Sequence, residues 1–416
     1  MPQIHRLSPY RDRRNLWHLF VFVRIISSLN CAGFIFFFTL PLKPFSMKTI
    51  KLPFAILISA CLALSGVVNA QDIHFSQFTQ SPLTLNPALA GTSVWIRAGM
   101  IFRDQWRAVH SMNSNNTFTT LGASFDIKSK RRWIKAKNQT ERYRQSGDNG
   151  FGWGVNIYND RAGDGHMGTL NVNGTLAYQI MTGEKSMIAL GFQGGIMQRS
   201  IDFSKLYWGT QYDPTSSTGY NVALPADKAI AGGDDSFIIP DLGTGLTYTY
   251  KKNERYMRGN DQMDFTLGAA LFHAAPFKYS FLGSTEKLYQ RLVIHGMSTI
   301  GIKNTSIALV PAVMIQKQGP NQEIFAGSMV RYMLKEDSKY TGYVKGASIS
   351  AGGYYRNKDA FVAAALFEFA SYGIGVSYDF NLSGLRTVSS GRGGLEITLR
   401  FLNPSPFLFS QASFGK

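Results

Sequence analysis

Cysteine is almost absent from this chain of 416 residues. The only two cysteines, Cys31 and Cys61, lie close to the amino terminus. A disulfide framework and a cysteine-based zinc or iron–sulfur site are therefore excluded for the bulk of the protein.

Long apolar runs are also missing after the first 70 residues. No stretch of 18 consecutive apolar residues follows Gln71, so the sequence predicts no transmembrane helix there. Apolar material is nevertheless plentiful, since 44% of the residues are hydrophobic and 13% are aromatic, which excludes a disordered chain. The 41 glycines disfavour a helical protein, because each glycine in a helix interior costs about 1 kcal/mol. This composition is typical of a β protein.

Signatures of catalysis and of cofactor or metal binding are missing as well. The glycines are scattered rather than gathered in a phosphate-binding loop. A calcium-loop likeness at Asp160, Asp164 and Gly165 lacks the other acidic ligands. No histidine after Gln71 belongs to an HExxH pattern or a nucleophile elbow. These histidines are His74, His110, His166, His273 and His295. We predict a protein that is not an enzyme and binds no cofactor or metal.

The first 70 residues contain a leader. Residues 47–70 begin with Met47, carry two lysines, continue into an apolar centre and end in small residues, which is typical of a secretory signal peptide cleaved after Ala70. We interpret residues 1–46 as a mis-called upstream start that is absent from the mature protein. An unusually long leader or a membrane anchor are the alternatives, and a lipobox-like sequence ending at Cys61 leaves lipid attachment open.

The formal net charge of +17 is partly a property of this leader. Residues 1–70 hold eight Lys or Arg and one acid, so the remainder has 35 bases, 25 acids and a net charge of +10. Eight of these bases lie between Lys128 and Asn149. In a cytosolic protein this segment would suggest single-stranded nucleic acid as a partner. Export removes that partner, so we expect outer-membrane lipid, lipopolysaccharide or an acidic protein surface, with a plain solvated loop as the alternative.

Period-two alternation recurs along the chain after Gln71. In residues 169–180, Leu170, Leu176 and Ile180 share an apolar face, and Asn171 and Asn173 lie on the hydrophilic face, as in a strand between two environments. Fourteen such segments are predicted, starting near residues 94, 118, 150, 168, 186, 239, 262, 290, 305, 322, 344, 360, 371 and 393.

These strands predict an all-β fold, a transmembrane antiparallel β-barrel of about 14 strands with both termini periplasmic. A secreted β-sandwich is the alternative. Export, the small or polar residues on one face and the aromatics at strand ends favour the outer-membrane barrel. Connections near 183–184, 303–304 and 371–372 are short, as periplasmic turns are, and the longest connection, Ser200 to Ile238, falls outside. The basic segment is the exception, being long and on the periplasmic side.

Several motifs resemble those of a known family. They are Phe75-Ser76-Gln77-Phe78, Leu85-Asn86-Pro87-Ala88-Leu89, Phe102-Arg103-Asp104-Gln105-Trp106, Ser377-Tyr378-Asp379-Phe380-Asn381 and Gly393-Gly394-Leu395-Glu396-Ile397. Together they resemble the PorP/SprF family of type IX secretion system membrane proteins. The resemblance implies an outer-membrane barrel that helps to export and anchor cargo, including adhesins of gliding motility, and associates with other components of the machine. One departure is a C-terminal extension, residues 404–416, after the last strand.

The expected domains follow from these patterns: a lead-in at 71–92 on the periplasmic side and a barrel at 93–403. Asn86-Pro87 predicts an irregular turn, so the lead-in either plugs the barrel or merely packs the amino terminus. We expect function to be the docking of a cargo's C-terminal domain; the alternative is a pore for small solutes. Candidate partner-binding residues are Phe75, Phe78, Asn86 and Pro87 in the lead-in, Arg131, Arg132 and Trp133 in the basic segment, Tyr207, Trp208 and Tyr212 in the longest connection, and Asp379, Asn381 and Ser383 where the thirteenth strand leads into a loop.

Overall fold

The computed structural model of the chain describes residues 72–92, 94–106, 118–130, 150–163, 165–182, 185–217, 219–221, 223–225, 235–252, 255–256, 259–260, 262–281, 285–335 and 346–403. Among these residues, no helix has both the length and the apolar character needed to span a membrane.

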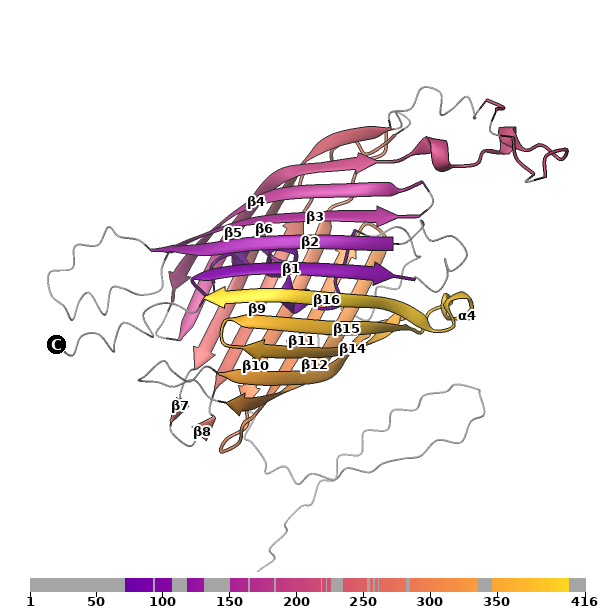
Figure 1. Ribbon diagram of the computed structural model, residues 1–416. Coiled ribbons are helices and arrows are strands. Elements are labelled where there is room, and N and C mark those ends of the chain that lie inside the picture. Colours follow the sequence, from indigo (N-terminus) through magenta and orange to yellow (C-terminus); the bar gives the residue numbers. More distant parts are fainter. Residues whose placement is uncertain are drawn as a thin grey trace, which may run out of the picture. The chain divides into compact units, whose positions relative to one another are not determined.

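Fourteen strands of the described part close into one antiparallel barrel (Figure 1). They are β1 (Ile96–Gln105), β2 (Phe118–Lys130), β3 (Gly150–Ala162), β4 (Met167–Met181), β5 (Ser186–Ser200), β6 (Ser236–Lys252), β9 (Met263–Phe272), β10 (Arg291–Gly301), β11 (Ile307–Gln318), β12 (Asn321–Lys335), β13 (Ala347–Arg356), β14 (Ala360–Phe369), β15 (Tyr372–Asn381) and β16 (Arg392–Asn403). Each begins within three residues of its predicted start. Sequence neighbours pair throughout, and β1 pairs with β16 to close the ring. The predicted fold class and strand number are confirmed.

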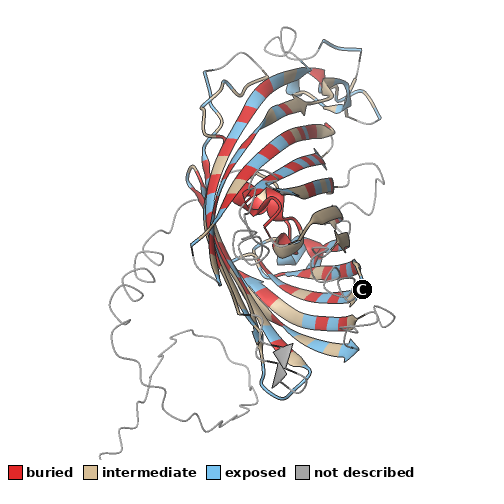
Figure 2. Ribbon diagram, turned by 90° about the vertical axis from the view of Figure 1, so that its left-hand side faces the viewer, coloured by how far each residue is buried: buried red, intermediate tan, exposed pale blue. Residues whose placement is uncertain are grey.

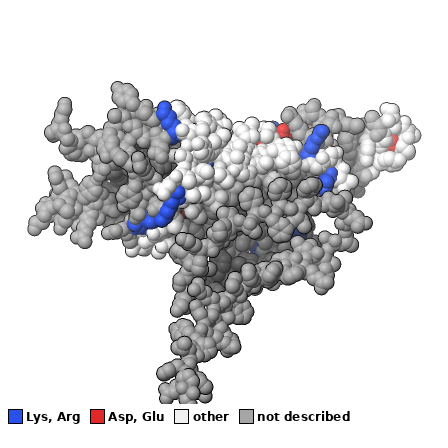
Figure 3. Space-filling model, turned by 90° about the horizontal axis from the view of Figure 1, so that it is seen from below, with Lys and Arg blue, Asp and Glu red and all other residues white. Residues whose placement is uncertain are grey.

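The barrel wall has an apolar outer face. Along β3, exposed Phe151, Trp153 and Val155 alternate with buried Gly154 and Asn156, and the same alternation is visible on most strands in Figure 2. Leu170, Leu176 and Ile180 are likewise exposed while Asn171 and Asn173 are buried, as predicted. Figure 3 shows uncharged surface between the Lys and Arg side chains at the two ends of the strands. An outward apolar belt of this kind faces lipid.

The inner face differs between two sides of the ring. Polar residues line β1 to β6, but apolar side chains line much of β9 to β14, including Phe272, Val293, Met314, Phe325 and Val362. The expectation that lumen-facing positions would be small or polar therefore holds on one side only. The apolar side exists because it packs against an apolar segment inside the barrel.

That internal segment is residues 72–92, here called the lead-in. It contains three short helices, η1 (Phe78–Gln80), α2 (Pro82–Leu85) and η2 (Pro87–Leu89), which appear as buried turns inside the ring of strands in Figure 2. Asn86 is extended, with φ −161° and ψ 124°, because a residue before proline avoids the helical region. Pro87 then begins η2, and the turn predicted at Asn86-Pro87 is confirmed.

The base of the barrel is the end where β1 begins and β16 ends, and the rim is the opposite end. Each end of the barrel has short and long connections, and the rim has the short connections 319–320 and 357–359 as well as the longest one. Short connections 182–185, 302–306 and 370–371 lie at the base, whereas the long connection 201–235, with η3 (Phe203–Lys205) and η4 (Gly209–Gln211), lies at the rim. This grouping agrees with the predicted topology. The basic segment 128–149 begins in the last three residues of β2, at the base, and its residues 131–149 lie outside the described residues.

Two further elements lie within the connections between barrel strands. A two-stranded sheet of β7 (Arg255–Tyr256) and β8 (Gly259–Asn260) lies between β6 and β9, at the base. The short helix α4 (Arg386–Ser389) lies between β15 and β16, at the rim.

Candidate functional site: the filled lumen

The lead-in is buried almost throughout its length inside the barrel. Ser76, Leu83, Asn86, Ala88 and Ala90 each have 0% relative exposure. Their contacts come from the inner faces of strands on all sides of the ring. These contacts are described below, first the polar ones from the rim to the base and then the apolar ones. The described lead-in thus fills the lumen that a pore of this strand number could contain.

At the rim, Asp72 joins the lead-in to a buried histidine. His273, directly after β9, lies with Nε2 2.8 Å from Asp72 Oδ2 and Nδ1 2.8 Å from Asp241 Oδ1. Burial alone would lower the pKa of His273, but the hydrogen bonds and charges of these carboxylates raise it to about 9. Burial would raise the pKa of Asp72, but Arg291, 3.6 Å away, and His273 hold it well below its usual range. A charged pair therefore fixes this end of the segment.

Below the rim, the lead-in meets a cluster of buried charges from β1, β12, β13, β15 and β16. Arg103 Nη2 lies 3.0 Å from Asp379 Oδ2, and Arg356 Nη1 lies 3.3 Å from the same oxygen. Arg356 Nε is also 3.2 Å from Glu323 Oε1, and Arg103 Nη1 is 3.8 Å from Glu396 Oε2. These five side chains are all at most 5% exposed. Buried charges are tolerated when they are paired in this way.

The lead-in completes this cluster with its own backbone and side chains. The N–H groups of Ser76 and Gln77 donate to the two oxygens of Glu396 at 2.8 and 2.6 Å. The Ser76 hydroxyl donates to Asp379 at 2.7 Å and accepts from Arg356 at 2.9 Å. Arg103 also donates to the carbonyl of His74. The charged side chains of the wall therefore surround the backbone of the lead-in at Ser76 and Gln77.

In the middle of the lumen, Asn86 binds the wall of β6, β9 and β10. Its Nδ2 donates to the carbonyls of Leu246 and Ala269, both at 3.2 Å, and lies 3.1 Å from His295 Nε2. Its Oδ1 accepts the N–H of Ala88 at 2.9 Å, which caps η2. Asn86 thus anchors the turn and the wall with one side chain.

Towards the base, the lead-in is tied to β1, β2 and β4. Arg97 binds Asp126 through two hydrogen bonds of 2.7 and 2.9 Å, and Asp126 also accepts the N–H of Gly91 at 2.8 Å. Gln179 donates to the carbonyl of Ala90 at 2.8 Å. The lead-in therefore runs from the rim, at Asp72, to the base, where β1 begins.

Apolar contacts hold the opposite side of the lead-in. Phe78 packs edge-on against Phe325 and Tyr354, with ring centroids 5.4 and 6.2 Å apart. Leu85 and Leu89 belong to the same buried cluster. The cavity beside Asp241, His273 and Tyr158 measures about 10 Å³, roughly room for one water molecule.

The predicted lead-in residues are all internal. Phe75 and Phe78 are 4% exposed, and Asn86 and Pro87 are buried. They contact the barrel wall, so the structure supports the plug and gives these side chains no surface for another protein.

Two of the three candidate residues that were expected where the thirteenth strand leads into a loop lie inside the barrel wall. Asp379 and Asn381 belong to β15 and are 3% and 5% exposed. Asp379 lies in the charge cluster, and Asn381 donates to Ser389 Oγ and to the carbonyl of Arg392. Ser383 is half-buried beyond the strand. The inward-facing side chains of β15 were expected to lead into solvent. They are buried instead, because they face a lumen that the lead-in occupies.

The other predicted residues lie at opposite ends. Arg131, Arg132 and Trp133 fall outside the described residues. At the rim, Tyr207 is 69% and Tyr212 62% exposed, and Trp208 is half-buried.

The rim aromatics form a connected surface. Tyr220 lies between Tyr207 and Tyr212, with ring centroids 5.1 and 6.3 Å away. Behind them, rings 4.8 to 6.4 Å apart link the 201–235 connection to the connection between β9 and β10. These rings are Trp208, Phe203, Phe281, Phe237 and Tyr279. We call Tyr207, Tyr212 and Tyr220 the rim aromatic patch.

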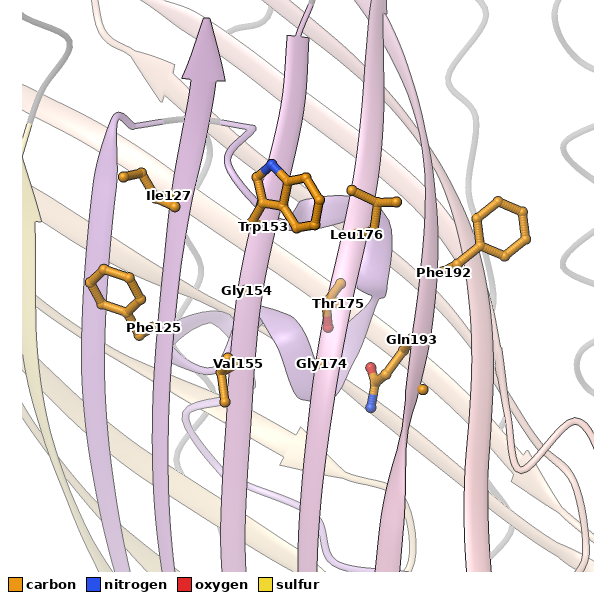
Figure 4. A pocket seen from close by; sticks show the side chains of 11 residues that line it. Phe125, Ile127, Trp153, Gly154, Val155, Gly174, Thr175, Leu176, Phe192 and Gln193 are labelled. Carbon is orange, nitrogen blue, oxygen red and sulfur yellow. The ribbon is translucent and has the colours of Figure 1, made fainter.

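A second concavity lies on the lipid-facing wall. It has a volume of about 660 Å³ and is lined by apolar side chains such as Phe125, Trp153 and Leu176 (Figure 4). Its floor includes the paired Gly174 and Gly194. This hollow belongs to the apolar outer belt, although Thr175 and Gln193 also line it.

The sequence reasoning missed the partners of the inward charges. Arg103, Asp379 and Glu396 lie in the three motifs quoted above, and Ser76 and Gln77 in another, but nothing local shows that they meet. A signal was present, since charges on one face of an otherwise apolar strand need internal partners in a membrane barrel.

Comparison with known proteins is consistent with this architecture. The family described as type IX secretion system membrane protein PorP/SprF matches residues 67–401. No curated protein matches the chain. Similar solved structures include CdiB from Acinetobacter baumannii, with 6% identity, 74% of this chain and 60% of that chain covered, and a TM-score of 0.33. This chain thus spans less than two thirds of CdiB.

Two other solved structures are similar at the level of fold. The TodX deltaS2S3 mutant monoaromatic hydrocarbon channel shows 10% identity over 82% of this chain and 96% of that chain, with a TM-score of 0.39. The translocator domain of the autotransporter NalP from Neisseria meningitidis shows 8% identity over 78% and 92%, with a TM-score of 0.29.

Proposed function

Since the chain belongs to the PorP/SprF family of type IX secretion system membrane proteins, we propose that this outer-membrane barrel docks secreted cargo at the cell surface. In this proposal the base faces the periplasm and the rim faces outward. The leader is removed after Ala70, and the mature protein begins at Gln71. The cargo is a protein with a C-terminal sorting domain, such as a surface adhesin of gliding cells.

The filled lumen is the observation that carries the proposal. A protein that moved solutes through its barrel would need an open or readily opened channel. Here the ion pairs of Asp72, the hydrogen bonds of Ser76 and Asn86 and an apolar cluster hold the lead-in inside the barrel. Displacing the lead-in would leave the buried carboxylates of Glu396 and Asp379 without these donors, and a buried group without its partner costs about 1–3 kcal/mol or more. This argues against the alternative function, a pore for small solutes.

The rim aromatic patch supplies the docking surface. Exposed tyrosines provide large contact area with little loss of side-chain freedom, and they are enriched where proteins bind one another. Ring contacts join the three tyrosines to one another, and the connection that carries them is tied to the β9–β10 connection through Phe203 and Phe281. At the base, we assign the basic segment 128–149 to contacts with lipid headgroups, lipopolysaccharide or acidic periplasmic components of the machine.

A cargo-display experiment tests the proposal. Deleting the gene should abolish surface display of one or a few cargo proteins without changing outer-membrane permeability. The triple variant Tyr207→Ala, Tyr212→Ala and Tyr220→Ala should reproduce this loss while the barrel still inserts. Val388→Ala is the matched control, because Val388 is 65% exposed in another rim connection. Normal display of all cargo in the triple variant would refute docking at this patch.

A further inference from the structure

The direction of the lead-in has a topological consequence. We infer that the chain enters the lumen at the rim, so that the amino-terminal end of the mature protein lies on the same face as the rim aromatic patch. This inference rests on the proposed function only for which face is outside the cell. It was not expected from the sequence, where β1 starting at the base placed the amino terminus there too.

The first described residues are bound only to groups near the rim. Asp72 N–H donates to Gln318 Oε1, at the last residue of β11, at 2.9 Å, and the Asp72 carboxylate contacts His273 and Arg291. Arg291 is the first residue of β10 and also donates to the carbonyl of Ile73. In this antiparallel ring, the end of β11 and the start of β10 lie at the rim.

Later residues of the lead-in bind groups farther from the rim. Ser76 and Gln77 bind Glu396, in the first half of β16, and Gln80 binds Arg400, near its end. Ala90 and Gly91 then bind Gln179 and Asp126, close to the base ends of β4 and β2. The chain therefore enters from the rim, nears the base at Gln80, moves back towards the middle at Asn86 and reaches the base again at Gly91 before it turns into β1.

Chain length excludes a return to the base. One residue spans at most about 3.6 Å, and a wall strand of ten residues such as β1 is roughly 33 Å long. With the predicted cleavage after Ala70, only Gln71 precedes Asp72. One residue cannot cover that distance, and the lumen is already occupied.

Two consequences follow for assembly and for docking. A leader still held on the periplasmic side cannot also reach the rim, so cleavage precedes the filling of the lumen. Once threaded, the amino-terminal end lies beside the β9–β10 connection that begins at His273. Tyr279 and Phe281 of that connection pack on Phe237 of β6, and Phe281 also contacts Phe203, in the connection that carries the rim aromatic patch. The amino-terminal end therefore lies at the same end of the barrel as the proposed docking surface.

Cysteine labelling tests this inference, because both native cysteines precede Gln71 and the mature chain has none. A Ser-Gly-Cys-Gly insertion after Gln71 marks the amino-terminal end. Ser217→Cys marks the rim, and Ser306→Cys marks the base; both positions are exposed. Each full-length variant is treated with a membrane-impermeant maleimide on intact cells and after permeabilisation, and its folding is checked by heat-modifiable electrophoretic mobility.

We expect the inserted cysteine to follow Ser217→Cys in both conditions. If both are labelled only after permeabilisation, the rim faces the periplasm: the proposed docking orientation fails, but the inference stands. Labelling that follows Ser306→Cys would overturn it, as would protection of the inserted cysteine until the barrel is unfolded. A second insertion, with the cysteine moved two residues further from Asp72, should give the same result, which excludes a local effect of the first.

Discussion

The outer and inner faces of the barrel wall place different requirements on their side chains, although the same strands form both faces. On the outer face, residues such as Leu190 and Phe192 meet lipid, which adapts to any apolar shape. On the inner face, Gly191 of the same strand meets the lead-in, which has one shape. The outer face therefore needs only the correct polarity, whereas the inner face must fit individual atoms. Pairs of substitutions, one on the inner face and one on the outer face, test whether the two faces differ in this way.

The largest effect is expected for Glu396→Ala. The change removes the acceptor of the Ser76 and Gln77 N–H groups and leaves Arg103 with one carboxylate fewer. Because a buried charge loses its partner, the free energy of unfolding should fall by about 3–5 kcal/mol. Urea titration of the barrel in lipid vesicles measures it. Leu399→Ala, on the outer face of the same strand, is the control, and an equal loss there would contradict the comparison.

Leu85→Ala should have the next largest effect. Leu85 is 3% exposed and packs in the apolar cluster of the lumen. The cavity left by the substitution cannot be filled by lipid, so we expect a loss of about 3 kcal/mol. Leu190→Ala on the lipid-facing side of β5 should cost less, because acyl chains fill the space. The same titration gives both values, and a larger cost for the outer leucine would show that the lead-in is loosely packed.

A glycine pair on β5 gives a smaller but cleaner contrast. A Cβ on Gly191 would lie 2.3 Å from the backbone nitrogen of Ala88, whereas a Cβ on Gly194 meets nothing closer than 3.7 Å. Gly191→Ala should therefore destabilise the barrel by about 1–3 kcal/mol through overpacking. Gly194→Ala, three residues away and facing lipid, should change it by about 0.5 kcal/mol or less. Equal melting temperatures for the two variants would contradict the close approach of the lead-in.

The smallest effect is expected at the rim and depends on pH. The pKa of His273 is raised to about 9, from an ordinary value of about 6.5. Its stabilisation is therefore complete below about pH 6.5 and is lost as the pH rises through about 9. Asp72, with a lowered pKa, keeps its contribution above about pH 3.9.

Comparing the wild type with His273→Gln isolates this contribution. The groups facing His273 are Asp72 and Asp241, and Arg291 faces Asp72. The difference in unfolding free energy between the two proteins should be largest between about pH 4 and 6.5 and shrink above pH 9. A difference that grows with pH would show that His273 is neutral in the folded protein.

The outer wall could be predicted from sequence because its rule is local. Alternation within ten to fifteen residues, as in β4, reports which side chains face lipid, and this placed all fourteen strands. The apolar inner side was harder, because residues 307–318 are apolar on both faces and period-two reasoning cannot say what the second face meets.

The filled lumen was predictable only as one of two alternatives. Pro87 showed that the lead-in is irregular, and its aromatic residues suggested that it is buried. The partners of those residues were beyond local reasoning, since Ser76 and Glu396 are 320 positions apart. Asp379 shows the same limit: its place in the alternation was correct, but whether that face met solvent or the lead-in depended on the whole barrel.

Single-channel conductance in planar bilayers tests the central claim most directly. The account predicts that the purified wild-type barrel stays closed, because the lead-in occupies the lumen from rim to base. Glu396→Ala, with the lead-in less firmly held, should show more frequent openings. A stable open conductance in the wild type, unchanged in Glu396→Ala, would contradict the filled lumen and favour a solute pore.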